Sequence, residues 1–165
     1  MEYGIKTDFN EMLDKAESYL KTADHLIYIT YPLIKENVII KTVLDNLHKT
    51  VINVVKSILN YEGLYKRIQL IHENADINTF QRCAPRFNIT VQEISTIKEI
   101  FSLAEKRQES TMEFIRRDKL VIMSDNLKTE SISLEQLKKY LNILKIILHK
   151  TKEKISQDRN ILIKY

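Results

Sequence analysis

One arginine and one histidine stand five positions apart near the middle of the chain, as Arg67 and His72. A metal-independent ribonuclease needs such a pair, because the histidine moves the proton of the ribose 2′-hydroxyl and the cation stabilises the phosphorane-like transition state. The chain contains 4 histidines, so a spacing of this kind also arises by chance. Two interpretations therefore stay open: a catalytic pair, or two residues that only decorate the end of a helix.

A row of basic and polar residues near the C-terminus forms a second candidate site. Its members are spaced by four, three, four and three residues, so they share one face of a helix: Lys138, Asn142, Lys145, His149 and Lys152. The basic surface is extended by three residues that precede this helix, Arg116, Arg117 and Lys119. Evenly spaced cations along a helix are typical of a surface that follows the phosphates of a nucleic acid. The alternative is an ordinary solvated outer face of the helix.

Metal and cofactor sites have no support in the sequence. The histidines are scattered, and Cys83 is the only cysteine, so a zinc site is not expected. Gly4 and Gly63 are the only glycines, too few for a phosphate-binding loop, and neither adjoins a serine as a nucleophile elbow requires. His48 borders the apolar stripe of a predicted helix, where we expect a hydrogen bond to a neighbour to hold it. We therefore expect no metal and no cofactor.

These side chains must be positioned mainly by helices, because residues that break helices are scarce. The 165 residues include 2 glycines and 2 prolines, where average usage predicts about a dozen and about eight. Hairpin turns and phosphate-binding loops need backbone conformations that glycine supplies most readily. Helix starts are instead marked by three capping boxes, which begin at Asp8, Thr90 and Ser133.

Apolar spacings of three and four residues predict four helices, over about 8–31, 38–62, 91–106 and 134–158. Pro32 should end or kink the first helix by pushing Tyr31 out of the α region. Gly63 is expected at the C′ position of the second, unless that helix runs on past it. Residues 73–90 are interpreted as an irregular connection, and residues 119–132 predict a short β-hairpin. The predicted fold is mainly all-α: one domain over 1–165, a four-helix bundle with the hairpin inserted before the last helix.

Composition and charge restrict the class of protein further. One cysteine cannot form an internal disulfide, which indicates a reducing compartment. Carboxylates interrupt residues 1–25 and no apolar run approaches about 20 residues, so we expect a cytoplasmic protein with no signal peptide and no membrane span. The net charge of +4 combines −2 over residues 1–80 with +6 over residues 81–165. The basic excess therefore lies in the C-terminal half, which favours an acidic partner there.

Two helical segments carry a resemblance to a known family. Lys15–His25, KAESYLKTADH, and Leu47–Leu59, LHKTVINVVKSIL, are similar to the opening helices of HEPN-type four-helix bundles. The resemblance implies a nucleotide-binding or ribonuclease module that commonly dimerises through the bundle. A third segment, Glu113–Tyr140, resembles small uncharacterised archaeal proteins.

The chain departs from the pattern of active HEPN ribonucleases, which carry an arginine, a polar residue and a histidine near the start of the final helix. Here the final helix has His149 with no arginine before it, and Arg159 with no histidine after it. Arg67 and His72 match the spacing elsewhere, with apolar Ile68 in the second position. These departures imply an inactive or unrelated bundle.

We therefore expect a non-catalytic intracellular interaction module that forms a homodimer. Its basic C-terminal half would bind RNA or an acidic protein. The alternative is a HEPN-like, metal-independent ribonuclease that acts through Arg67 and His72.

Overall fold

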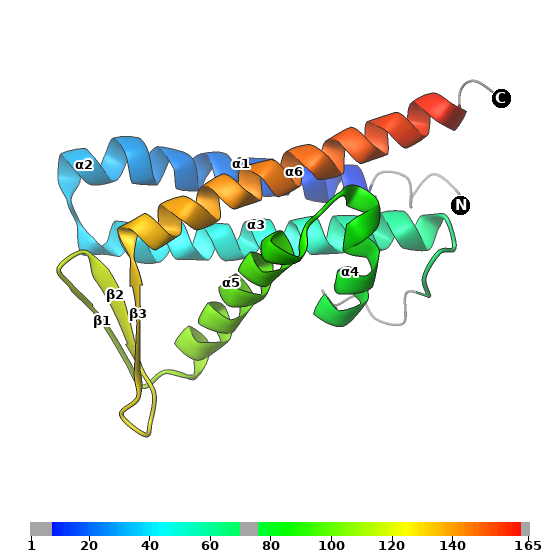
Figure 1. Ribbon diagram of the computed structural model, residues 1–165. Helices are drawn as coiled ribbons and strands as arrows, with labels where there is room; N and C mark the ends of the chain where they lie inside the picture. The colour runs from blue at the N-terminus through cyan, green and yellow to red at the C-terminus, as the bar shows by residue number, and fades with distance from the viewer. Residues whose placement is uncertain (1–7, 70–75, 163–165) are drawn as a thin grey trace.

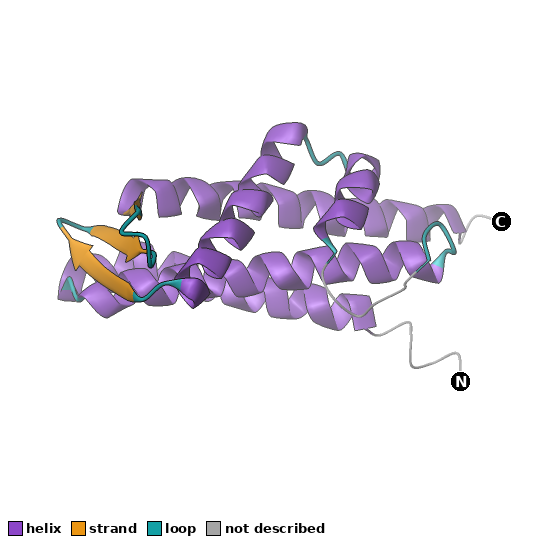
Figure 2. Ribbon diagram, turned by 90° about the horizontal axis from the view of Figure 1, so that it is seen from below, coloured by secondary structure: helices purple, strands orange, loops and turns teal. Residues whose placement is uncertain are grey.

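The computed structural model describes residues 8–69 and 76–162 of the chain, except for the side chains of Asp8 and Leu162. Three long helices run side by side, α1 (Asp8–His25), α3 (Asn37–Leu64) and α6 (Leu134–Leu162) (Figure 1). A further helix, α5 (Val91–Glu109), crosses them at a slant, and a small sheet stands at one end of the molecule (Figures 1 and 2). The mainly helical class predicted from the scarcity of glycine and proline is confirmed.

Helix α3 is the central element, because its apolar side chains point in several directions. Leu47, Val51 and Val54 are fully buried, and the helix contacts α1, α5 and α6. Burying one Leu or Val side chain stabilises a fold by about 1.5–3 kcal/mol. A helix with so many buried positions therefore makes a large contribution to the hydrophobic free energy of folding.

The corner between α1 and α3 differs from the prediction at Pro32. The chain continues from α1 through a π-helical turn, η1 (Leu26–Thr30), into the short helix α2 (Tyr31–Ile34), so helical backbone passes Pro32. Tyr31 keeps helical angles of φ −61° and ψ −43°, and the prediction that Pro32 displaces it from the α region is wrong. In a regular helix the proline ring clashes with the carbonyl four residues earlier. The wider π-helical turn lies where that contact would fall.

The connection from α3 to α5 is more regular than predicted. It contains α4 (Ile77–Cys83) and the 3₁₀ turn η2 (Ala84–Phe87). Asp76 begins α4, and its carboxylate accepts a hydrogen bond from the backbone N–H of Asn78 at 3.0 Å. Gly63 lies inside the last turn of α3, and the left-handed residue beyond the helix is Lys66, with φ 56°. Of the two alternatives for Gly63, the C′ role is wrong, and the helix that runs on past Gly63 is confirmed.

The predicted helix starts differ in how fully their caps form. The capping box of Thr90 and Glu93 is confirmed, with both reciprocal hydrogen bonds present. The Ser133 hydroxyl accepts a hydrogen bond from the N–H of Gln136 at 3.1 Å, which is one half of a capping box. The side chain of Asp8 lies outside the described residues. Helices α5 and α6 run past their predicted ends at 106 and 158, to Glu109 and Leu162.

The predicted hairpin is part of a larger sheet. Strands β2 (Lys119–Met123) and β3 (Thr129–Ser133) form the hairpin, and β1 (Met112–Arg116) pairs with the other side of β2. Its inner face is buried against the helices through Leu120, Ile122 and Ile132. The third strand increases the stability of the sheet, since a two-stranded hairpin alone is marginally stable in water. All neighbouring strands are antiparallel, and β1 is an edge strand.

Candidate functional site

The basic row of α6 faces α1 and is partly neutralised by it. The Lys145 ammonium lies 2.5 Å from a carboxylate oxygen of Asp24, and the Lys152 ammonium lies 2.8 Å from one of Glu17. The hydrogen bond and the positive charge of Lys152 lower the pKa of the Glu17 carboxyl. Both lysines therefore close the seam between two helices rather than stand free for phosphates.

The other members of the row are also engaged or isolated. The Lys138 ammonium lies 5.6 Å from the centre of the Tyr28 ring and 3.4 Å from a carboxylate oxygen of Glu135. The His149 side chain is 80% exposed and lies 4.0 Å from the carboxylate of Glu153. Lys138, Lys145 and Lys152 therefore all lie close to carboxylates.

Three cations at the β1–β2 turn remain accessible. Arg116, Arg117 and Lys119 are exposed and make no ion pair with any of the residues that the structure describes. The turn itself consists of Arg117 and Asp118, both left-handed with φ of 51° and 60°. This geometry belongs to the tight turns that match the twist of antiparallel strands.

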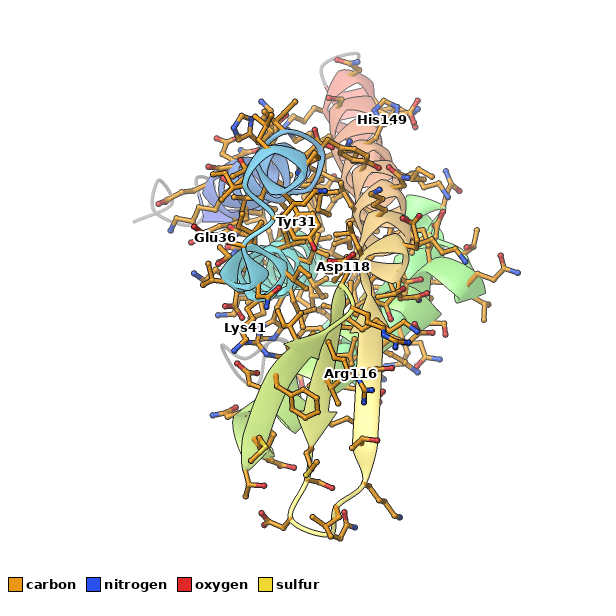
Figure 3. The ribbon with its side chains drawn as sticks, turned by 90° about the vertical axis from the view of Figure 1, so that its left-hand side faces the viewer. Tyr31, Glu36, Lys41, Arg116, Asp118 and His149 are labelled. Carbon is orange, nitrogen blue, oxygen red and sulfur yellow. The ribbon has the colours of Figure 1, made fainter. Side chains whose placement is uncertain are left out.

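A hydrogen bond anchors this turn to the helices. The Tyr31 hydroxyl donates to the Asp118 carboxylate, and the two side chains point toward each other in Figure 3. Tyr31 is buried, and burial together with the hydrogen bond to Asp118 raises the pKa of its phenol to about 12. The phenol is therefore a neutral hydrogen-bond donor at pH 7, and the turn is held at a fixed place beside α2.

The outer face of the sheet carries an exposed aromatic ring beside two of these cations. Side chains alternate along a strand, so Met112, Phe114 and Arg116 share the outer face of β1. Phe114 is 37% exposed and Met112 is 56% exposed. Arg116 is directly opposite Lys119 in the β1–β2 register, and it lies on the side of the sheet that faces the viewer in Figure 3. An apolar platform with cations at one end is the result.

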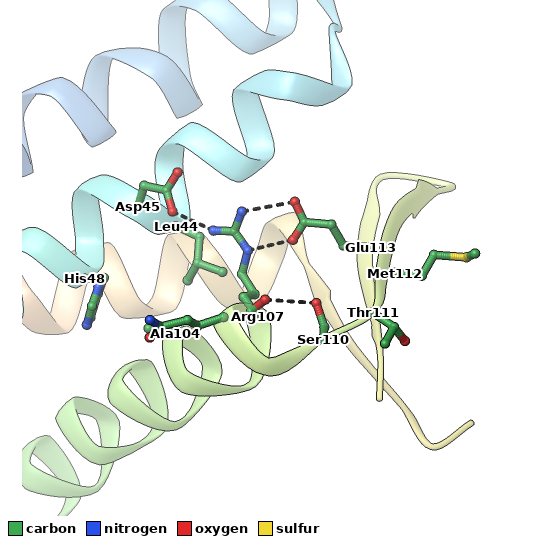
Figure 4. A pocket seen from close by; sticks show the side chains of 10 residues that line it. Leu44, Asp45, His48, Ala104, Arg107, Ser110, Thr111, Met112 and Glu113 are labelled. Carbon is green, nitrogen blue, oxygen red and sulfur yellow. Dashed lines mark hydrogen bonds and ion pairs between the residues drawn. The ribbon is translucent and has the colours of Figure 1, made fainter. Parts of the chain in front are cut away.

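A cleft of about 470 Å³ lies on the other side of β1, between α3, α5 and the start of that strand (Figure 4). Arg107 of α5 lies at its centre. Its Nη1 is 2.6 Å from Asp45, and its Nε and Nη2 donate to the two carboxylate oxygens of Glu113 at 2.9 and 3.3 Å. Glu113 also forms an ion pair with Lys41, whose Nζ lies 3.1 Å from Oε1 of Glu113. The hydrogen bond from Arg107 is the main cause that lowers the pKa of Glu113.

His48 forms one wall of the same cleft. Its ring meets the ring of Phe101 edge-on, with centroids 5.6 Å apart and planes at 88°. Burial lowers the pKa of this imidazole, so the ring is neutral at pH 7. The expected hydrogen bond to a neighbour is wrong: among the described residues, packing on Phe101 and not a hydrogen bond holds the ring.

Arg67 lies in a structural ion-pair cluster. Its Nη1 is 3.0 Å from one carboxylate oxygen of Glu62, and Arg86 Nε is 3.4 Å from the other. Only 2% of the Glu62 side chain is exposed, and a buried carboxylate needs such partners. His72 lies outside the described residues. The described half of the proposed catalytic pair is thus engaged in holding Glu62.

Sequence reasoning missed Phe114 and Arg107 as candidates. Met112, Glu113 and Phe114 alternate between apolar and polar, but Ile115 breaks the alternation, so the local signal for a strand is weak. Nothing local marks Arg107, since one of its partners, Asp45, lies 62 positions away.

No group of metal-binding side chains is present among residues 8–69 and 76–162. In the same part of the chain, no helix has both the length and the apolar character that a membrane span requires. No protein-family model and no curated protein matches the sequence.

Proposed function

We propose that this protein binds single-stranded RNA across the outer face of its sheet, without cleaving it. One observation carries the proposal: exposed Phe114 shares that face with Arg116 and Lys119, which have no ion-pair partner in the described part of the chain. RNA is also the partner expected from the sequence, but the binding surface proposed here is the outer face of the sheet and not α6.

The chemistry of the face suits an unpaired nucleotide. A base that stacks on an aromatic side chain contributes about 1–3 kcal/mol of binding free energy. Arg116 follows Phe114 by two residues, roughly 7 Å along the strand, and Lys119 stands opposite it on β2. A base on Phe114 would leave its flanking phosphates within reach of both cations, whose contribution depends on salt.

The anchored turn supports binding because it limits the entropy that must be lost. The hydrogen bond from Tyr31 to Asp118 fixes the turn between Arg116 and Lys119 before any ligand arrives. Preorganised groups bind more tightly than groups that must first be ordered.

The α6 row is less suited to RNA. Phosphates would have to displace Asp24 and Glu17 from Lys145 and Lys152, which already form close pairs. The ribonuclease alternative has no support from Arg67, because that side chain is engaged with Glu62.

Fluorescence anisotropy with a labelled single-stranded RNA of about eight nucleotides tests the proposal. Phe114→Ala should weaken binding roughly 5- to 150-fold, which corresponds to the loss of one stacked base. Arg116→Glu and Lys119→Glu should weaken binding and also flatten its salt dependence, by about 0.7 in the logarithmic slope for each lost contact.

Lys66→Glu is the matched control, because Lys66 is exposed and follows the end of α3 that lies away from the sheet (Figure 1). Equal weakening by Lys66→Glu would show a non-specific charge effect, and unchanged binding by Phe114→Ala would remove the sheet face from consideration. Gel analysis of the RNA after incubation in chelator separates binding from cleavage.

A further inference from the structure

The cleft beside β1 is lined by one cation, Arg107, and two carboxylates, Asp45 and Glu113, and Lys41 beyond the lining balances the second carboxylate. Two cations, Lys41 and Arg107, lie against two carboxylates, Asp45 and Glu113, in one connected chain of ion pairs. With neither sign in excess, the cleft does not favour a small anion or a small cation. Its volume of about 470 Å³ lies within the roughly 300–1,000 Å³ typical of small-molecule sites. A neutral ligand is the chemistry that fits.

The planar guanidinium of Arg107 belongs to a residue that lines the cleft. All three of its nitrogens donate to Asp45 or Glu113, and these bonds lie along the edge of the group, as Figure 4 shows. The side chain is only 15% exposed, so the plane is fixed. None of these hydrogen bonds uses the face of the guanidinium, and planar π systems stack on such a face.

His48 supplies hydrogen-bonding groups on a neighbouring wall. A neutral imidazole has one donor and one acceptor nitrogen, and none of the described residues occupies either. The ring is held by its edge-on contact with Phe101. Leu44 and Ala104 add apolar surface between His48 and Arg107 (Figure 4).

The geometry points to a nucleobase as the ligand of this cleft, stacked on Arg107 and hydrogen-bonded along its edge by His48. A nucleobase is neutral and planar, and it carries donors and acceptors on its edge. It could belong to a free nucleoside, or to a nucleotide of the RNA strand that passes over the edge of β1. Only the second source rests on the proposed function.

Titration of the four ribonucleosides into the wild-type protein tests the inference, with the imidazole proton resonances of His48 as the NMR probe. At least one nucleoside should shift these resonances in a saturable way. Calorimetry should show that His48→Phe, which keeps an aromatic ring beside Phe101, weakens that binding about 10-fold or more. His25→Phe is the matched control, because His25 is an exposed histidine of α1 that does not line the cleft, and it should bind as the wild type does.

A second arm distinguishes the two sources with RNAs that carry one abasic position each. If the loss of one base weakens RNA binding to the wild type but not to His48→Phe, the base in the cleft belongs to the RNA strand. If nucleosides bind and no abasic position has this effect, the ligand of the cleft is a free nucleoside. If no nucleoside moves the His48 resonances, the cleft site is wrong, even where RNA binds in a Phe114-dependent way. Nucleoside binding in a protein that does not bind RNA would leave the cleft site standing and remove the proposed function.

Discussion

Tyr31 connects the sheet to the helices through one hydrogen bond, to a carboxylate 87 positions further along the chain. Its ring is buried in the core, while its hydroxyl reaches Asp118 at the exposed turn. The ring and the hydroxyl therefore have separate roles, which a substitution by phenylalanine separates.

Tyr31→Phe should lower the free energy of unfolding by about 1 kcal/mol, because the ring stays and only the hydrogen bond is lost. Urea denaturation measures this change, and hydrogen exchange of the hairpin amides should become faster. Tyr28→Phe is the control, since Tyr28 is an exposed tyrosine of the same corner. If both variants unfold at the wild-type midpoint, the hydrogen bond does not hold the turn.

Glu113 makes stability depend on pH, and the sign follows from its lowered pKa. A carboxyl whose pKa is lower in the folded state than in the unfolded state stabilises the fold above its ordinary value of 4.5. That contribution is lost as the pH falls through the folded value. In Glu113→Gln, the free energy of unfolding should therefore vary less between about pH 5 and about pH 3 than in the wild type.

Urea midpoints across this range measure the difference. Glu109→Gln is the control, because Glu109 is exposed and forms no ion pair with another described residue. A pH dependence that is the same in Glu113→Gln and in the wild type would contradict the expectation.

At the scale of residues, the sequence predicts periodicity but not partners. The spacing of Lys145 and Lys152 placed both on one face of a helix, yet Asp24 and Glu17 lie 121 and 135 positions away. The strand that carries Phe114 is not predicted for a different reason: Ile115 breaks the apolar–polar alternation that Met112, Glu113 and Phe114 begin. Long-range pairing determines which cations are free, and local spacing carries no information about it.

Helix α5 begins at a capping box that the sequence predicted and the structure contains. Thr90→Ala should lower the free energy of unfolding by about 1 kcal/mol, since it removes the acceptor for the N–H of Glu93. Thr90→Ser keeps the hydroxyl and should unfold close to the wild-type midpoint in urea. Equal destabilisation by both variants would mean that the methyl group of Thr90, rather than its hydroxyl, supports the helix.

At the scale of elements, the sequence predicts the long helices and the hairpin of β2 and β3, but neither α4 nor β1. The apolar stripe of α3 is long enough to be recognised from its period alone, whereas α4 spans 7 residues and β1 spans 5. The prediction at Pro32 is wrong for a physical reason: the wider π-helical turn before it relieves the steric clash that a proline causes in a regular helix. Such a turn depends on the packing of the corner and has no signature in the spacing.

Over the whole molecule, ion pairs between the two halves of the chain neutralise part of the charge asymmetry of the sequence. The acidic N-terminal half meets the basic C-terminal half along the seam of α1 and α6, where Glu17 and Asp24 pair with Lys152 and Lys145. The net charge of +6 over residues 81–165 can be counted from the sequence. How much of it remains available to a partner depends on how the two helices pack.

Lys152→Glu should therefore change stability more than binding. It places a second carboxylate beside Glu17, and we expect a loss of no more than about 1 kcal/mol, because both side chains are more than one third exposed. Thermal unfolding measures the loss, and RNA affinity should fall less than in Arg116→Glu. If Lys152→Glu and Arg116→Glu lose RNA affinity equally, α6 also contributes to the RNA-binding surface, which contradicts the proposal.

The left-handed turn of Arg117 and Asp118 has a consequence for engineering. A non-glycine residue in this conformation costs about 1–2 kcal/mol, and hairpins of this type prefer Asn-Gly. Arg117→Gly should therefore raise the melting temperature while it removes one cation from the end of the sheet. A higher melting temperature together with a lower RNA affinity would show that this turn is less stable than it could be because its residues serve binding. A thermostabilised variant should then keep Arg117.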